Sequence, residues 1–185
     1  MNSHITAVII GCELGFWLLI AVGLSARYLI RQPRLGAIVL ALVPVLDVVL
    51  IAAVTVDLHG GAEVTTVHRI AGLYLGISVA FGAYLVRWAD VRFAYLFADG
   101  PAPVKLPKHG PEAFRHECAL FFRWLVAAAI TAVAVLALTL TVADDAQSTA
   151  LWEVFPTIGV VTVIWLITGP VWELGAARSD AEARS

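Results

Sequence analysis

Five long apolar segments constrain this chain more than any other feature of its sequence. They cover about residues 5–26, 36–56, 70–88, 120–142 and 151–172. A helix of about 20 apolar residues crosses the hydrocarbon core of a bilayer, which is about 30 Å thick. None of the segments shows the apolar–polar alternation of a membrane barrel strand. The sequence therefore predicts an all-α polytopic membrane protein, with residues 1–185 forming a single five-transmembrane-helix bundle.

The composition leads to the same prediction. Hydrophobic residues make up 61% of the 185 positions, charged residues make up 14%, and the mean hydropathy is +0.89. Soluble domains are about 45–50% apolar and about 25% charged. A domain of this size has too much surface to hide such an excess from water. The predicted partner is the lipid bilayer. A formal net charge of −2 without a basic stripe argues against nucleic acid.

The basic residues predict the orientation of the bundle. Of the 12 Lys and Arg residues, only Arg69 falls on one side of the predicted membrane. The others are Arg27, Arg31, Arg34, Arg87, Arg92, Lys105, Lys108, Arg115, Arg123, Arg178 and Arg184. Because Lys and Arg collect in cytoplasmic loops, we expect the N-terminus outside and the C-terminus inside. The loop 87–117 and the tail 173–185 are then cytoplasmic.

Tryptophans and glycines predict how the helices sit and pack. Trp88, Trp124 and Trp172 are expected at the inner membrane interface, and Trp152 at the outer one. Trp17 and Trp165 lie deeper, where we expect them to pack against neighbouring helices. The pairs Gly11/Gly15 and Gly72/Gly76 have the spacing that lets helix backbones approach closely. We expect such pairs to serve packing within the chain, with homo-oligomerisation as the alternative.

Two acids lie within the apolar segments, Glu13 in the first and Asp47 in the second. Intramembrane acids are costly, face the bundle interior and are functional candidates by default. At about 1.5 Å per residue, both lie about 14–15 Å below the outer surface. If they meet, at least one is expected to be protonated near neutral pH. Glu13, Asp47 and Ser78 are therefore candidates for a proton or cation site. The alternative is that each acid is neutral and hydrogen-bonded to a neighbouring helix.

Other polar residues at this depth have a structural interpretation. Ser78, Thr131 and Thr162 lie on the last three segments, and hydroxyl groups commonly hydrogen-bond between membrane helices. Pro44 has no N–H, so it leaves the carbonyl of Leu40 without its helical partner. We expect it to loosen the second segment, either as a packing kink or as a hinge.

A second polar cluster lies at the predicted outer surface. Asp57, His59 and His68 are its candidate site residues, with Glu63 and Arg69 nearby. Imidazole and carboxylate groups bind metals, but a zinc site needs three or four ligands in a suitable arrangement. The spacing of His59 and His68 matches no specific motif, and such residues are also stable at an interface without a ligand. No confident metal site is predicted.

The known cofactor motifs are absent from the sequence. No histidine lies in mid-span, where paired axial ligands would hold a haem. His116-Glu117 lacks the second histidine of a zinc-protease helix. Phosphate-binding loops, nucleophile elbows and paired redox cysteines do not occur. No cofactor is predicted.

Four stretches carry a resemblance to known proteins: DLHGG at 57–61, HRIAGLYLG at 68–76, RWAD at 87–90 and GPAPVK at 100–105. They resemble small multi-pass membrane proteins of bacteria that have no assigned function. The resemblance covers the second and third segments with the loop that follows them. It implies a bacterial plasma (inner) membrane and supplies no catalytic residue.

Three classes of function stay open on the sequence alone. The favoured class is a small proton- or cation-responsive, transport-related protein that uses its buried carboxyl groups. The second is a membrane enzyme with an extracytoplasmic His/Asp site. The third is a non-catalytic subunit of a larger membrane complex, in which the loop 87–117 docks a partner. Enzyme activity is left undecided, and a homo-oligomer is compatible with each class.

Overall fold

The structure is a computed structural model that describes residues 3–30, 32–97, 100–104, 107 and 110–173. Its elements are α1 (Ser3–Tyr28), α2 (Pro33–Ala41), α3 (Val43–His59), α4 (Thr66–Phe97), α5 (Pro111–Thr141), α6 (Asp145–Trp152), α7 (Val154–Leu166) and a π-helix (Ile167–Val171). No strand occurs within these described residues. The tail predicted at 173–185 lies outside them beyond its first residue.

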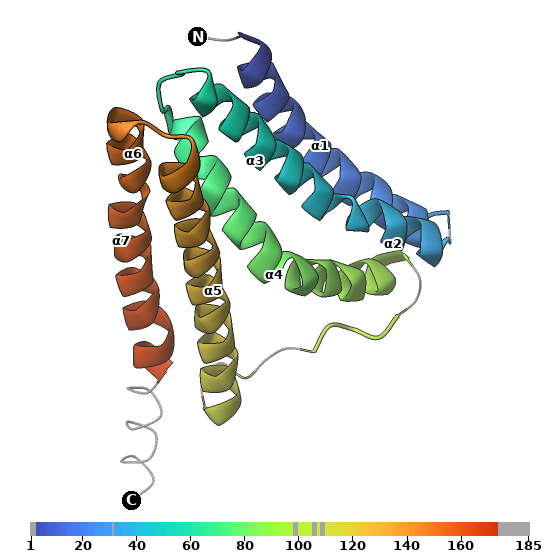
Figure 1. Cartoon of the computed structure of the whole chain (residues 1–185). Helices are drawn as coiled ribbons and strands as arrows, with labels where there is room; N and C mark the ends of the chain where they lie inside the picture. Colours follow the sequence, from blue (N-terminus) through green and yellow to red (C-terminus); the bar gives the residue numbers. More distant parts are fainter. Residues whose placement is uncertain (1–2, 31, 98–99, 105–106, 108–109, 174–185) are drawn as a thin grey trace, which may run out of the picture.

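The helices form one bundle in which α4 has a central place (Figure 1). α1 and α3 run side by side on one side of α4, and α5 and α7 run side by side on the other. Among the described residues, four segments are long and apolar enough to cross a membrane, namely Arg34–His59, His68–Leu96, Pro111–Thr141 and Asp145–Val171. α1 adds a shorter apolar helix, Leu14–Tyr28. The predicted all-α polytopic membrane protein is confirmed, and a five-helix bundle is compatible with these segments.

Prolines explain why two of these segments are divided into shorter helices. A proline lacks the N–H that would bond to the carbonyl four residues earlier. Pro44 therefore leaves the carbonyl of Leu40 without its usual helical donor, and α2 ends one residue after Leu40, at Ala41. Pro156 does the same to Trp152, where α6 ends. The loosening of the second segment predicted from Pro44 thus appears as a break between α2 and α3 at Leu42.

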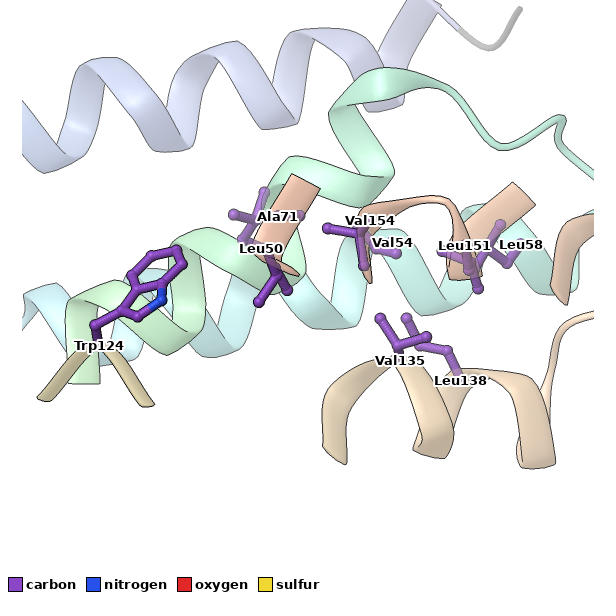
Figure 2. Close-up of a cluster of buried hydrophobic side chains, with 10 residues drawn as sticks. Leu50, Val54, Leu58, Ala71, Trp124, Val135, Leu138, Leu151 and Val154 are labelled. Atoms are coloured by element: carbon purple, nitrogen blue, oxygen red, sulfur yellow. The ribbon is translucent and has the colours of Figure 1, made fainter. Parts of the chain in front are cut away.

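The hydrophobic core lies where α3, α4, α5 and the α6–α7 segment meet (Figure 2). Its buried members are Leu50, Val54, Leu58, Ala71, Trp124, Val135, Leu138, Leu151, Val154 and Ile158. Trp124 is only 5% exposed, and its indole N–H donates to Thr162 Oγ1 at 2.8 Å. Its indole is therefore packed inside the bundle rather than turned outward to lipid. Trp17 differs in the opposite way, because it is 68% exposed rather than packed between helices.

Glycine sets the closest helix contact, between α4 and α5. A Cβ added at Gly76 would overlap the carbonyl oxygen of Ala127 and lie 2.6 Å from Thr131 Oγ1. One turn away, Thr131 Oγ1 donates to the carbonyl oxygen of Gly72 at 3.2 Å. The glycine pair on α4 therefore packs inside the chain. The pair on α1 does not act as a unit, because Gly15 faces Leu46 while nothing lies within 4 Å of a Cβ at Gly11.

Candidate functional site

The buried face of α3 carries the two acids of this helix. Asp47, Leu50, Val54 and Asp57 are all buried. They follow one another at steps of three and four residues, which places them on one side of an α-helix. Leu50 and Val54 belong to the hydrophobic core. This otherwise apolar face of α3 therefore carries polar side chains at two levels. We call the level of Asp57, near the end of α3, the upper level and that of Asp47 the lower level.

The upper level is a pair between α3 and the start of α4. His68 Nε2 lies 3.1 Å from Asp57 Oδ2, and the two residues are 5% and 7% exposed. Asp57 belongs to the last turn of α3, where the helix dipole disfavours a negative charge. The first turn of α4, which carries His68, presents the favourable end of its own dipole. The second oxygen, Oδ1, is buried without a hydrogen-bond partner among the described residues.

The loop between the two helices fixes the tautomer of His68. The backbone N–H of Thr65 donates to His68 Nδ1 at 3.1 Å, and the Thr65 hydroxyl lies 2.9 Å from the same atom. A backbone N–H can only donate, so Nδ1 accepts and the ring proton sits on Nε2. Nε2–H then donates to Asp57. Thr65 immediately precedes α4, so His68 occupies the third helical position, where capping boxes usually have Glu or Gln.

The end of α3 is also held by Gln147, which, like His68, caps a later helix and contacts α3. Asp144 and Gln147 form a capping box at the start of α6. The amide of Gln147 also donates to the carbonyl oxygens of Leu58 at 3.1 Å and Ala62 at 2.7 Å. The chain reverses here through Gly61, whose φ of 77° is a left-handed conformation that glycine adopts without strain. Two capping side chains therefore clamp the end of α3 to the helices that follow it.

The lower level is the pair of Asp47 on α3 and Ser78 on α4. Asp47 is 2% exposed, and the Ser78 side chain lies close to its carboxyl group. Its Oδ2 has no hydrogen-bond partner among the residues that the structure describes. The structure thus brings together two of the three candidates predicted for a proton or cation site. The third, Glu13, lies in α1, but its side chain is outside the described part of the chain.

The two levels share one antiparallel register. Moving ten residues along α3 from Asp57 to Asp47 corresponds to moving ten residues along α4 from His68 to Ser78. This is about 15 Å of helix. Buried Leu50, Val54 and Ala71 occupy the interval in the core (Figure 2). Because proton transfer needs donors and acceptors within hydrogen-bond reach, this apolar interval separates the two polar pairs.

The remaining members of the predicted outer cluster do not join the Asp57–His68 pair. His59 and Glu63 are exposed, and Arg69 forms an ion pair with Glu153 at the start of α7. Within the described chain, no group of three or more His, Cys, Asp or Glu residues is placed to hold a metal ion. The cluster is therefore a buried dyad with a separate surface ion pair.

Thr65 and Gln147 were not among the sequence candidates, although both carry a readable signal. The sequence Asp144-Asp145-Ala146-Gln147 has the spacing of a capping box at the start of a helix, with Gln147 three residues after Asp144. Thr65 and His68 have the same spacing. The signal predicts the local cap in each case. It does not predict that the capping side chain also reaches α3.

The apolar segments and buried polar pairs define a class, the multi-pass α-helical membrane proteins. The chain is 37% identical over 152 residues to the "Uncharacterized membrane protein YmcC" of Bacillus subtilis (strain 168). The match covers 82% of this chain and 80% of that protein. The chain belongs to the family of this membrane protein, which confirms the resemblance found in the sequence. No family model matches the chain, and no solved structure matches it.

Proposed function

We propose that this protein is a proton-responsive, transport-related protein of the plasma membrane in which Asp47 is the proton-binding group. The observation that carries the proposal is the environment of this carboxyl group. It is 2% exposed within an apolar segment, and the Ser78 side chain of α4 lies close to it. An acid in such a place costs several kcal/mol when charged. The presence of such an acid in the interior of the bundle is a reason to assign it a function.

The break between α2 and α3 supports a response to protonation. Leu42 lies five residues, or about one and a half turns, before Asp47. A helix that is interrupted next to a buried titratable group has a place where its backbone dihedrals can change, as hinges require. Gain or loss of the proton on Asp47 changes the strength of its contact with α4. This gives the proton a way to bias the position of the adjoining half of α3.

The apolar interval above Asp47 supports a gated pathway rather than an open one. Leu50, Val54 and Ala71 are each 5% exposed or less, and they separate Asp47 from the Asp57–His68 pair. A proton that reaches Asp47 from the outer side must therefore wait for this interface to open. The proposal includes a homo-oligomer or a membrane complex as the working form.

Flux measurements on purified protein test the proposal. The protein is reconstituted into liposomes that contain a pH-sensitive dye, and a proton gradient is imposed. We expect Asp47→Asn to abolish the proton-dependent signal, Ser78→Ala to weaken it, and Asp145→Asn, which changes an exposed acid, to leave it intact. Glu13→Gln is measured in parallel. Undiminished flux in both the Glu13 and the Asp47 variants would discard the transport role.

Infrared titration tests proton binding separately from flux. A protonated carboxyl group has a C=O band that ionised carboxylates lack. We expect Asp47→Asn to remove a band that titrates in the wild-type protein and Asp145→Asn to retain it. Identical difference spectra for the wild type and Asp47→Asn would show that Asp47 is not the proton-binding group. Membrane fractionation of cells that express the protein tests the plasma-membrane location.

A further inference from the structure

The C-terminal end of α4 extends past the length that a membrane span requires. The apolar segment His68–Leu96 has 29 residues. At about 1.5 Å per residue it is about 43 Å long, whereas the hydrocarbon core is about 30 Å thick. Trp88 lies twenty positions after His68, which is about 30 Å along the helix. The following turns therefore lie at the level of the lipid headgroups, and Figure 1 shows them bending away from α5.

One side of these last turns is exposed and combines aromatic, aliphatic and basic groups. We call it the α4 end face, and it consists of Trp88, Val91, Arg92, Tyr95 and Leu96. The steps of three and one between these residues place them on a single side of the helix. The guanidinium carbon of Arg92 lies 3.7 Å from the centroid of the Trp88 ring. This stacking positions the guanidinium group beside the interfacial tryptophan.

The opposite side of the same turns is occupied by α1. Asp90 Oδ2 lies 3.2 Å from Arg27 Nη1, and the Tyr28 hydroxyl donates to Asp90 Oδ1 at 2.8 Å. The rings of Tyr28 and Phe93 stack with centroids 5.7 Å apart. These contacts fix which side of the helix end faces outward.

The distribution of charge over the two sides is unequal. Asp90 is the only acidic residue in the sequence from Arg87 to Phe97, and its carboxylate is paired with Arg27 and Tyr28. The α4 end face includes the basic Arg92 and no acidic residue. Arg87, which directly precedes Trp88, is also exposed. The pairing of Asp90 with α1 therefore leaves a basic, aromatic surface at headgroup depth.

We propose that the α4 end face binds the headgroup of an anionic phospholipid in the adjacent leaflet. Arg92 donates hydrogen bonds to the lipid phosphate, while Trp88, Tyr95 and the two aliphatic side chains lie against the upper acyl chains. Aromatic rings and basic groups favour this depth of the bilayer. The helix continues from the span without a break, so this face meets lipid before it can meet any soluble partner.

Native mass spectrometry of the detergent-solubilised protein tests the proposal. The full chain is mixed with equal amounts of phosphatidylglycerol and phosphatidylcholine, and the ratio of the two bound lipids is measured. We expect the wild type to retain phosphatidylglycerol preferentially. Arg92→Gln is expected to lower this ratio about fivefold, the factor implied by one basic residue's attraction to an anionic surface. Trp88→Leu is expected to lower it as well.

The control variant is Arg115→Gln, which removes an exposed basic residue near the start of α5. Its lipid ratio is expected to equal that of the wild type. An equal ratio in Arg92→Gln and the wild type, with both folded by circular dichroism, overturns the proposal. So does release of the bound lipid by excess inorganic phosphate, because that result assigns the face to free phosphate. Retention of phosphatidylglycerol in the presence of phosphate supports the lipid site.

Discussion

The contact of α4 with α5 gives the sharpest prediction about how the bundle is held together. In Gly76→Ala, the new methyl group would overlap the carbonyl oxygen of Ala127 and stand 2.6 Å from Thr131 Oγ1. The second distance is about 0.7 Å shorter than the shortest ordinary C···O contact. Ala127 contributes backbone, which cannot rotate away as a flexible side chain could. The two helices must therefore separate.

The cost of this separation follows from three effects. Overpacking a close interface costs about 1–3 kcal/mol. Moving α4 away also lengthens the 3.2 Å bond from Thr131 to Gly72, and bonds between membrane helices average about 0.6 kcal/mol. Replacing Gly by Ala returns up to about 1 kcal/mol through helix propensity. We expect the free energy of unfolding of Gly76→Ala to fall by about 1–2 kcal/mol.

Gly82→Ala is the matched control, since nothing lies within 4 Å of a Cβ at this position of the same helix. We expect it to be neutral, or more stable by up to about 1 kcal/mol. Both variants and the wild type are unfolded reversibly with sodium dodecyl sulfate in mixed micelles and followed by far-ultraviolet circular dichroism. Equal midpoints and slopes for Gly76→Ala and Gly82→Ala would refute the close approach of α4 and α5.

Three further predictions concern the polar contacts. His68→Ala leaves Asp57 buried without its partner, so the free energy of unfolding should fall by about 3 kcal/mol in the same assay. In His68→Gln the free energy of unfolding should fall much less, and an equal fall in both variants would argue against a capping role. Gln147→Ala removes two bonds to the end of α3, so amide hydrogens of residues 60–62 should exchange faster while those of 48–54 do not change; uniform acceleration would contradict a local clamp. Thr131→Val should cost about 0.6 kcal/mol, and a loss as large as that of Gly76→Ala would attribute the effect to the hydrogen bond rather than to crowding.

Hydropathy predicted the membrane helices because the length of an apolar segment is set by the bilayer. It could not predict which side of each helix faces the core. Lipid and protein interior are both apolar, so the helical period that marks a buried face in a soluble protein is weak here. Trp124 and Trp17 show the consequence. Their depths follow from position in the sequence, but burial depends on rotation about the helix axis, which only the packed bundle reveals.

For the candidate sites, the sequence likewise predicted which residues lie near one another but not which of them make contact. Asp57 and His68 were selected as titratable groups near one another at a predicted loop, and the structure pairs them. The sequence could not separate His68 from His59, because both border the same short connection. The difference is that His68 lies in the first turn of α4 and points back to α3, whereas His59 is the exposed last residue of α3. The sequence placed Ser78 at the depth of Asp47. It could not show that the two side chains face one another, because this depends on the rotation of α3 and α4 about their axes.

The two ends of α3 differ in a way that bears on the proposed proton site. At the His59 end, His68 and Gln147 tie the helix to α4 and α6 through the same residues that cap those helices. Loss of either contact leaves a buried polar group without its partner, so this end resists displacement. At the other end, the helix is interrupted at Leu42, and the short α2 precedes it in the chain. Asp47 lies on the interrupted side of the apolar interval. Under the proposed function, a change in its protonation would act on this interrupted half of α3, while the half that His68 and Gln147 hold would supply the fixed reference.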